Sequence, residues 1–166
     1  RNSPLAMSAL ETRKEIVRWA LASDFSEELD WIVSQARQLL EGGLLPEEIL
    51  IICLDDRNVK SYFSSLSARF SNFGIVTNDL LSNPFSTPQF VQEGCITMST
   101  VHRAKGNEAA AVLVCGTDAL AHDLDRRRSR NKLFTAFTRT KGWLRVSGLQ
   151  PAKPLFDEME RALTNS

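Results

Sequence analysis

Apolar residues in this chain alternate between short continuous runs and helix-like spacings. A continuous apolar run of strand length is typical of a parallel strand buried on both faces. Such runs, or shorter stretches rich in strand-forming residues, predict six strands. These are Glu15–Ala22, Ile49–Leu54, Gly74–Thr77, Cys95–Thr100, Ala109–Cys115 and Leu144–Ser147.

Between these runs, apolar residues recur every three or four positions, which predicts amphipathic helices. The pattern is clearest over Ser26–Glu41, where Gly42 and Gly43 follow as a stop signal. We expect a second helix over Val59–Phe70 and a third that ends near Lys141, after a charged linker over residues 118–130. Leu81–Gly94 contains two prolines and is predicted as a loop. Strands that alternate with helices indicate an α/β domain with a central, mostly parallel sheet.

Size and charge narrow the class of protein. The chain has 166 residues, enough for one ordinary domain, and 43% apolar with 24% charged residues is a normal globular balance. Lys plus Arg equals Asp plus Glu, 20 each, so nucleic-acid binding would have to rest on local clusters. Cys53, Cys95 and Cys115 lie in apolar runs and are expected to be buried thiols in a reducing cytoplasm. No apolar stretch reaches the roughly 20 residues of a membrane helix, so we expect no membrane association.

Two segments carry candidate chemistry. The first, Thr100–Glu108, places polar groups directly after a buried strand, where open α/β sheets bind ligands. Gly106 permits a tight backbone path. Lys105 could meet a phosphate or carboxylate, and Glu108 could accept hydrogen bonds from sugar hydroxyls. A solvated loop is the alternative interpretation.

The second segment is Arg126–Lys141. On a helix, Leu133, Ala136, Phe137 and Thr140 would share one face, and Arg128, Lys132, Thr135 and Arg139 the other. An arginine near the helix end could also interact with the C-terminal dipole, which leaves a structural role for Arg139 open. The cluster Arg126–Arg130 is either a solvated basic loop or a contact for a DNA backbone.

Both segments resemble motifs of one enzyme family. TVHRAKGNE, residues 100–108, resembles motif V of UvrD/Rep-like superfamily 1 helicases, and RNKLFTAFTRTK, residues 130–141, resembles motif VI. Ile49–Asn58 lies at the motif IV strand. The resemblance spans roughly residues 15–149 and implies a RecA-like three-layer domain, a P-loop NTPase-type fold without the P-loop. On this basis residues 1–14 are an N-terminal extension, 15–150 the RecA-like helicase C-terminal domain, and 151–166 a C-terminal helix or tail.

The resemblance also implies roles for individual residues. In the family, ATP lies between two RecA-like domains, and the second supplies a motif VI arginine finger, which here is Arg139. In motif V, Glu108 would bind the ribose of the nucleotide, and Lys105 and Gly106 would hold the turn at the nucleotide site. Arg57 and Lys60 both lie near the position of the family's motif IV arginine, and either could bind the nucleotide as a second contact to its γ-phosphate. The DNA-binding candidates are Thr100, His102, Arg103, Arg126, Arg127 and Arg128. No metal ligand is expected in this chain.

The function that the resemblance implies is the C-terminal motor domain of an ATP-dependent DNA helicase or translocase, with DNA repair as a suggested setting. The sequence has no G-x-x-x-x-G-K-[ST] motif and does not begin with Met. We therefore expect a piece of a longer protein, inactive alone, whose N-terminal RecA-like domain supplies the P-loop for ATP and Mg²⁺. The other partner would be single-stranded or tailed DNA. The alternative is a RecA-like module that binds nucleic acid or protein without ATP turnover.

Overall fold

The computed structural model describes residues 16–82 and 89–164. Within them, six strands form one parallel sheet in the order β1-β6-β5-β2-β4-β3. The strands are β1 (Val17–Ala22), β2 (Ile49–Cys53), β3 (Val76–Asp79), β4 (Cys95–Thr100), β5 (Ala109–Cys115) and β6 (Thr140–Leu149). This confirms the α/β fold class with a parallel sheet. Part of the predicted loop over Leu81–Gly94 lies outside the described residues.

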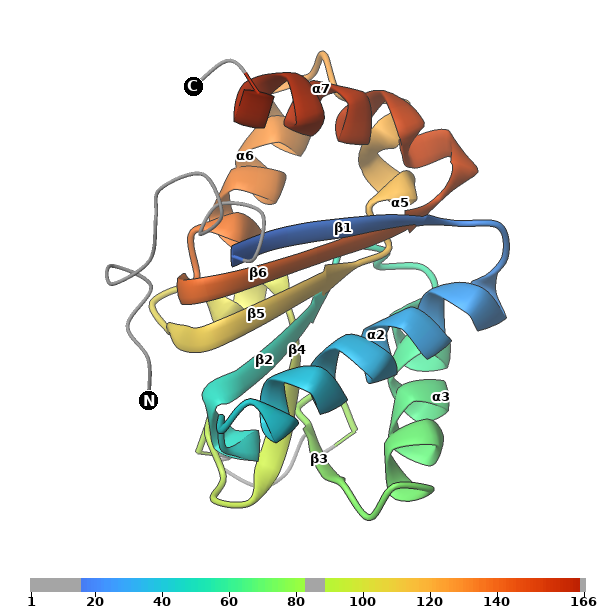
Figure 1. Ribbon diagram of the computed structural model, residues 1–166. Coiled ribbons are helices and arrows are strands. Elements are labelled where there is room, and N and C mark those ends of the chain that lie inside the picture. The colour runs from blue at the N-terminus through green and yellow to red at the C-terminus, as the bar shows by residue number, and fades with distance from the viewer. Residues whose placement is uncertain (1–15, 83–88, 165–166) are drawn as a thin grey trace.

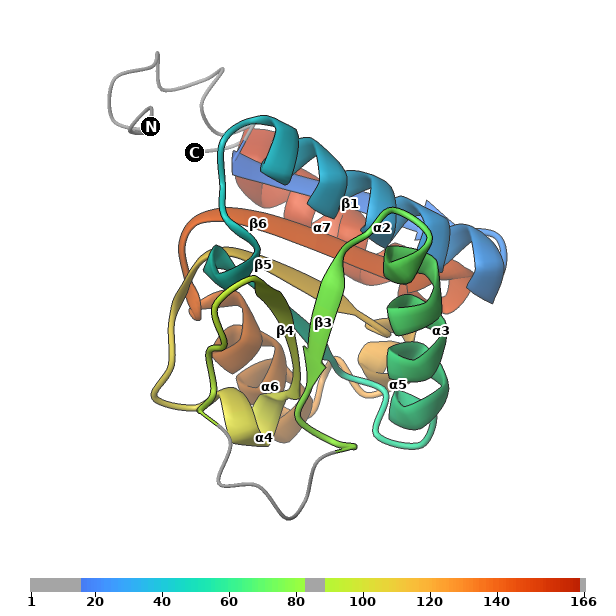
Figure 2. The same ribbon diagram turned by 90° about the horizontal axis from the view of Figure 1, so that it is seen from below.

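Helices cover both faces of the sheet, which gives three layers (Figure 1). The helices are α2 (Phe25–Glu41), α3 (Val59–Ser71), α4 (Val101–Ala104), α5 (Asp118–Ala121), α6 (Arg127–Phe137) and α7 (Lys153–Thr164), with 3-10 turns η2 (Pro46–Glu48) and η3 (Gln150–Ala152). Helices α2 and α3 lie together on one face, and α6 and α7 lie on the other, as Figure 2 also shows.

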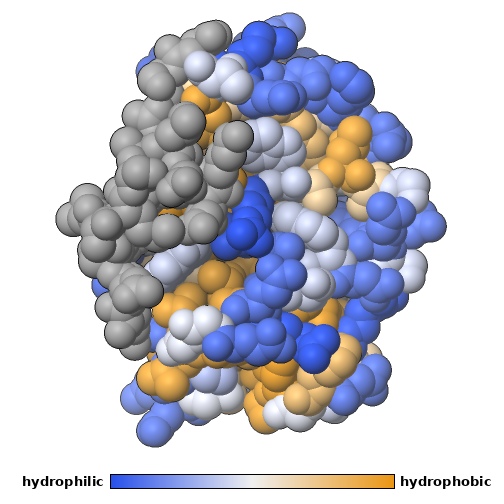
Figure 3. Space-filling model, in the orientation of Figure 1, coloured by the Kyte–Doolittle hydropathy of each residue, from blue (hydrophilic) through white to orange (hydrophobic). Residues whose placement is uncertain are grey.

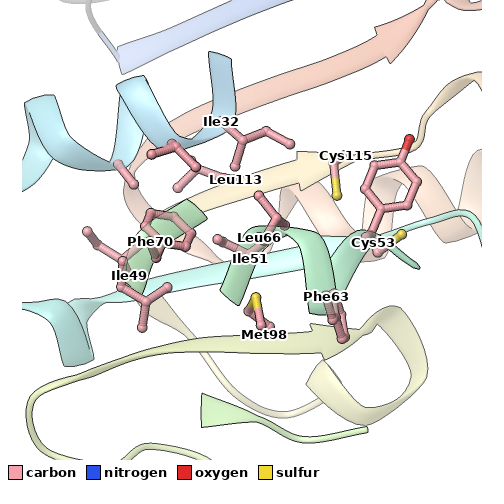
Figure 4. Close-up of a cluster of buried hydrophobic side chains, with 14 of the residues drawn as sticks. Ile32, Ile49, Ile51, Cys53, Phe63, Leu66, Phe70, Met98, Leu113 and Cys115 are labelled. Atoms are coloured by element: carbon pink, nitrogen blue, oxygen red, sulfur yellow. The ribbon is translucent and has the colours of Figure 1, made fainter. Parts of the chain in front are cut away.

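Each face of the sheet has its own apolar core because side chains alternate along a strand. On the α2 and α3 side, Ile49 and Ile51 of β2 and Leu113 of β5 pack against Phe63 and Phe70 of α3 (Figure 4). On the other side, the alternate residues of the same strands pack against α4, α6 and α7. Strand β2 is buried at all five positions, as its continuous apolar run predicts.

The local signals act as expected at helix α2. Asp24 is the N-cap, and its side chain accepts a hydrogen bond from the Glu27 N–H at 2.8 Å. The helix ends at Glu41, and Gly43 has a φ of 112°.

On the face shown in Figure 3, hydrophobic residues lie in small groups between hydrophilic ones.

One predicted element is wrong at both ends. The third helix was expected to follow a linker over residues 118–130 and to run to about Lys141, but α5 lies within that linker, α6 spans Arg127–Phe137 and β6 begins at Thr140. Thr140, which a helical pattern also fits, pairs instead with Ala109 of β5, and β6 pairs with β1 as well from Leu144 onward. Thr140 and Arg139, which were expected on opposite faces of the helix, therefore do not belong to it.

Candidate functional site

The segment from residue 100 to residue 108 connects β4 to β5 and contains helix α4. The Thr100 side chain caps α4 by accepting a hydrogen bond from the Arg103 N–H at 3.4 Å. Val101 and Ala104 are buried, whereas His102 and Arg103 are exposed. The apolar residues thus anchor the helix while the polar ones face outward. Gly106 has a φ of 82°, a conformation that side chains other than glycine rarely adopt.

A cavity of about 720 Å³ opens where β2 and β4 end, between α4 and α6. Four permanently basic side chains line it, together with Thr100 and His102 from the first candidate segment. The basic residues are Lys105, Arg127, Arg128 and Lys132. Asp56 is the one carboxylate in this described lining. The excess of positive charge makes this cavity, called here the basic pocket, suited to an anionic ligand.

A second hollow of about 540 Å³ lies beside the basic pocket and shares Thr100 and His102 with it. Leu80 and Leu81 supply apolar surface there, and Arg103 supplies a cation. Apolar surface next to cations is the combination that a nucleic-acid strand needs for its bases and its phosphates. Five of the six residues proposed from the sequence as DNA contacts, all except Arg126, therefore line two adjoining hollows.

Glu108 and Arg139 lie at the opposite edge of the sheet. Glu108 immediately precedes β5 and Arg139 immediately precedes β6, and these strands are parallel neighbours. The Ala109 N–H donates a hydrogen bond to the Arg139 carbonyl oxygen at 3.0 Å, which brings the two motif residues to neighbouring positions. Glu108 is exposed and Arg139 is half-buried.

The Arg139 guanidinium folds back on the last turn of α6. Its Nε donates to the Thr135 carbonyl oxygen at 3.0 Å, and its Nη2 donates to the Thr138 Oγ1 at 3.3 Å. A cation at a helix C-terminus is favourable because the free carbonyls there carry partial negative charge. The side chain was expected to project from the polar face of the helix, and this expectation is wrong, because Arg139 follows the helix and caps its end.

The structure separates other residues that the sequence grouped together. Arg57 and Lys60 follow β2, at the carboxyl edge of the sheet, whereas Glu108 and Arg139 lie at its amino edge. The length of β5 puts roughly 20 Å between the two edges. Arg126 forms an ion pair with Asp123 at 3.4 Å and is not in the lining of the basic pocket.

Sequence reasoning missed two groups. Lys132 was placed on the polar face of the third helix, but its ion pair with Asp56 joins residues far apart in the chain and could not be foreseen. The second group is Glu28, which is fully buried and accepts hydrogen bonds from Tyr62, Gly116 and Ser147. Burial raises the pKa of Glu28 above the usual range. A glutamate in the first turn of a helix gave no sign of this.

Within residues 16–82 and 89–164, none of the helices combines the length and the apolar character that crossing a membrane requires. In the same part of the chain, no three histidine, cysteine, aspartate or glutamate side chains gather in a way that could hold a metal ion.

Comparison with known proteins gives two findings. Residues 96–147, from β4 to β6, match the family model of the UvrD-like helicase C-terminal domain. The fold is similar to that of the C-terminal domain of a possible DNA helicase from Lactobacillus plantarum WCFS1, with a TM-score of 0.61 and 18% identity, over 81% of this chain and 74% of that one. No curated protein sequence matches. The matched segment contains the turn at residues 100–108 and Arg139, so this part of the chain is similar to the UvrD-like helicase C-terminal domain.

Proposed function

We propose that this chain is the second motor domain of an ATP-dependent superfamily 1 DNA helicase or translocase. The observation that carries the proposal is the hydrogen bond from the Ala109 N–H to the Arg139 carbonyl oxygen. It holds Glu108 and Arg139, from the two motif-like segments, next to each other at one open edge of the sheet. Two motif-like residues side by side at an open edge support a nucleotide site there.

In this proposal, Glu108 binds the ribose of ATP and Arg139 contacts its γ-phosphate. ATP supplies the phosphoryl group whose transfer to water drives the motor. A guanidinium stabilises the charge that develops during this transfer and raises rates by roughly 10³–10⁵ in well-studied systems. Arg139 would have to exchange its hydrogen bonds with Thr135 and Thr138 for bonds to phosphate. Both are exchangeable, because they go to a carbonyl and a hydroxyl rather than to a carboxylate.

Arg57 and Lys60 do not belong to this nucleotide site, because they lie at the other edge of the sheet. Lys105 also changes its assignment, since its side chain lines the basic pocket. Gly106 acts through the backbone of the turn alone. We assign Mg²⁺ to the N-terminal RecA-like domain of the parent protein, which would also supply the P-loop.

The basic pocket and the hollow beside it are the proposed path of single-stranded DNA. Thr100 and His102 lie between the two cavities, Arg103 lines one, and Arg127 and Arg128 line the other. Arg126, paired with Asp123, would contribute only to the long-range attraction of phosphates. The unpaired, buried thiols of Cys53 and Cys115 fit a reducing compartment such as the cytoplasm.

The second candidate function is a RecA-like binding module without ATP turnover. The hydrogen bonds of Arg139 to its own helix end favour it, because they give that side chain a purely structural role. The two roles of Arg139, arginine finger and helix cap, predict opposite effects of Arg139→Ala on ATPase rate and on stability. A structural cap would lower stability and leave any turnover intact.

The test uses the parent protein that contains this chain. If Arg139 is the arginine finger, Arg139→Ala abolishes most of the DNA-stimulated ATPase, at least 10³-fold, with its melting temperature and DNA affinity nearly unchanged. Arg139→Lys is the matched control, since it keeps the charge but not the planar set of donors, and it restores little activity. Normal ATPase in a less stable Arg139→Ala protein would instead show that Arg139 is a structural cap, whereas absence of ATPase from the unmutated parent protein would favour the binding module.

A further inference from the structure

The basic pocket contains an ion pair that neither motif-like segment accounts for. The Lys132 Nζ lies 2.7 Å from the Asp56 Oδ2, and it also donates to the Leu54 carbonyl oxygen at 3.5 Å. Lys132 comes from α6 and Asp56 from the loop after β2, so the pair spans one side of the pocket. The Lys132 side chain is 25% exposed and that of Asp56 is 65% exposed. The pair is therefore within reach of solvent and of a bound ligand.

Asp56 differs from the aspartate next to it. The Asp55 side chain organises its own loop, because its carboxylate accepts hydrogen bonds from the backbone N–H groups of Arg57 and Asn58 and from the Asn58 side chain. Asp56 has its carboxylate on Lys132 instead. It thus places a negative charge in the lining of a pocket whose other ionised side chains are cations.

We propose that Asp56 competes with a DNA backbone phosphate for Lys132 and thereby sets how tightly the basic pocket holds a single strand. The inference rests on the proposed function, in which this pocket binds DNA. An ammonium group is a compact charge whose three donors can move between an aspartate and a phosphate. A phosphate that enters the pocket meets a cation already neutralised by Asp56, and the carboxylate repels it.

The competition has a physical advantage for a motor. Affinity for a DNA backbone grows with each phosphate that a cation neutralises, because each releases counterions. Four unopposed cations in one pocket would slow the release of the strand at every step. A carboxylate that forms its ion pair with the lysine again when the strand leaves lowers that affinity, and the lysine remains available for the next phosphate. Asp56 is thus a residue that tunes binding, while Lys132 is the residue that contacts the phosphate.

The chain offers a closely matched control. Arg69 of α3 and Asp30 of α2 form an ion pair on the opposite face of the sheet, with side-chain exposures of 30% and 68%. These exposures are nearly the same as those of Lys132 and Asp56. Asp30→Asn removes the same charge from the same kind of pair, away from the basic pocket. Any effect of net charge alone appears equally in Asp30→Asn and Asp56→Asn.

The experiment measures binding of a fluorescent oligothymidylate to this chain at several salt concentrations. We expect Asp56→Asn to tighten binding about three- to fivefold, the effect of one exposed charge near a phosphate. The slope of log K against log salt should steepen by about 0.7, the value for one more neutralised phosphate of a single strand. Asp30→Asn should bind like the original chain.

A second variant tests the role of Lys132. Lys132→Gln should weaken binding, and adding Asp56→Asn to it should tighten binding less than Asp56→Asn does in the original chain, because only the direct repulsion by the carboxylate is then removed. The inference is overturned if the original chain binds the oligonucleotide and Asp56→Asn binds no more tightly than Asp30→Asn. It is also overturned if Lys132→Gln lowers the melting temperature but not the affinity. If the original chain does not bind at all, the proposed DNA path fails together with it.

Discussion

The buried carboxylate of Glu28 provides a strong test of what holds this fold together. One oxygen accepts a hydrogen bond from the Tyr62 hydroxyl at 2.5 Å. The other accepts from the Gly116 N–H at 3.1 Å and from the Ser147 Oγ at 2.8 Å. Glu28 is 0% exposed, so these three donors have little access to water. The side chain thus joins α2 to α3 and to the carboxyl ends of β5 and β6.

Glu28→Ala would leave three buried donors without an acceptor. Each such loss costs about 1–3 kcal/mol, so we expect the free energy of unfolding to fall by about 3 kcal/mol or more. Glu28→Gln keeps one acceptor oxygen for Gly116 and Ser147, and its amide can donate to the Tyr62 hydroxyl. It should cost only about 1 kcal/mol. Urea denaturation followed by circular dichroism at pH 7 measures both. A loss below 1 kcal/mol for Glu28→Ala would refute this account.

The pH dependence tests the same carboxylate independently. Burial, as the largest cause, raises the pKa of Glu28 in the folded state above that in the unfolded chain, which is about 4.3. A raised pKa means that the folded state binds the proton more tightly, so this contribution to stability is present below the unfolded pKa. It is lost as the pH rises through the folded pKa. The stability difference between the original chain and Glu28→Gln should therefore be larger at pH 4.5 than at pH 8, within the range where both remain folded. An equal difference at both pH values would contradict the shift.

Three further outcomes are expected. The isolated chain should release no phosphate from ATP, with or without DNA, in a coupled phosphate assay; turnover by the purified chain would refute the division of the site between two domains. Its binding to single-stranded DNA should be weak and fall steeply with salt, as fluorescence anisotropy can measure, because the affinity comes from a few cations. Gly148→Ala should lower the free energy of unfolding by about 1–3 kcal/mol in urea, since the added methyl would meet Thr117 and come within 2.9 Å of the Ala152 Cβ; unchanged stability would show that η3 can move aside.

The sequence predicted the elements whose stability is local or whose burial is complete. Ile49–Cys53 is a continuous apolar run, which predicts a strand buried on both faces, and Asp24 followed by Glu27 indicated the start of α2. The end of α6 was missed because Thr138–Lys141 fits a helix as well as a strand. Pairing of Thr140 with Ala109 of β5 decides between them, and no local pattern contains that information.

The candidate site was predicted unevenly for the same reason. Thr100, His102 and Arg128 share one pocket, as their positions after a strand and on a helix face suggested. Arg145 was predicted only as part of a strand, yet it is buried, and its guanidinium donates to Gln35 and to the Ile16 carbonyl oxygen. Burial and the nearby Arg18 lower the pKa of Arg145 to about 10. Contacts between residues more than a hundred positions apart depend on topology, which one sequence does not display.

Helix α6 has one end at each proposed site. Arg127 and Arg128 line the basic pocket at its first turn, and Arg139 follows its last. Its 11 residues make a rod about 16 Å long, seated on the sheet by the buried Leu133 and Ala136. The Arg139 side chain is hydrogen-bonded to the last turn of this helix through Thr135 and to Thr138 beyond it. Under the proposed roles, α6 is therefore the element that directly connects the nucleotide-facing arginine to the DNA-facing arginines.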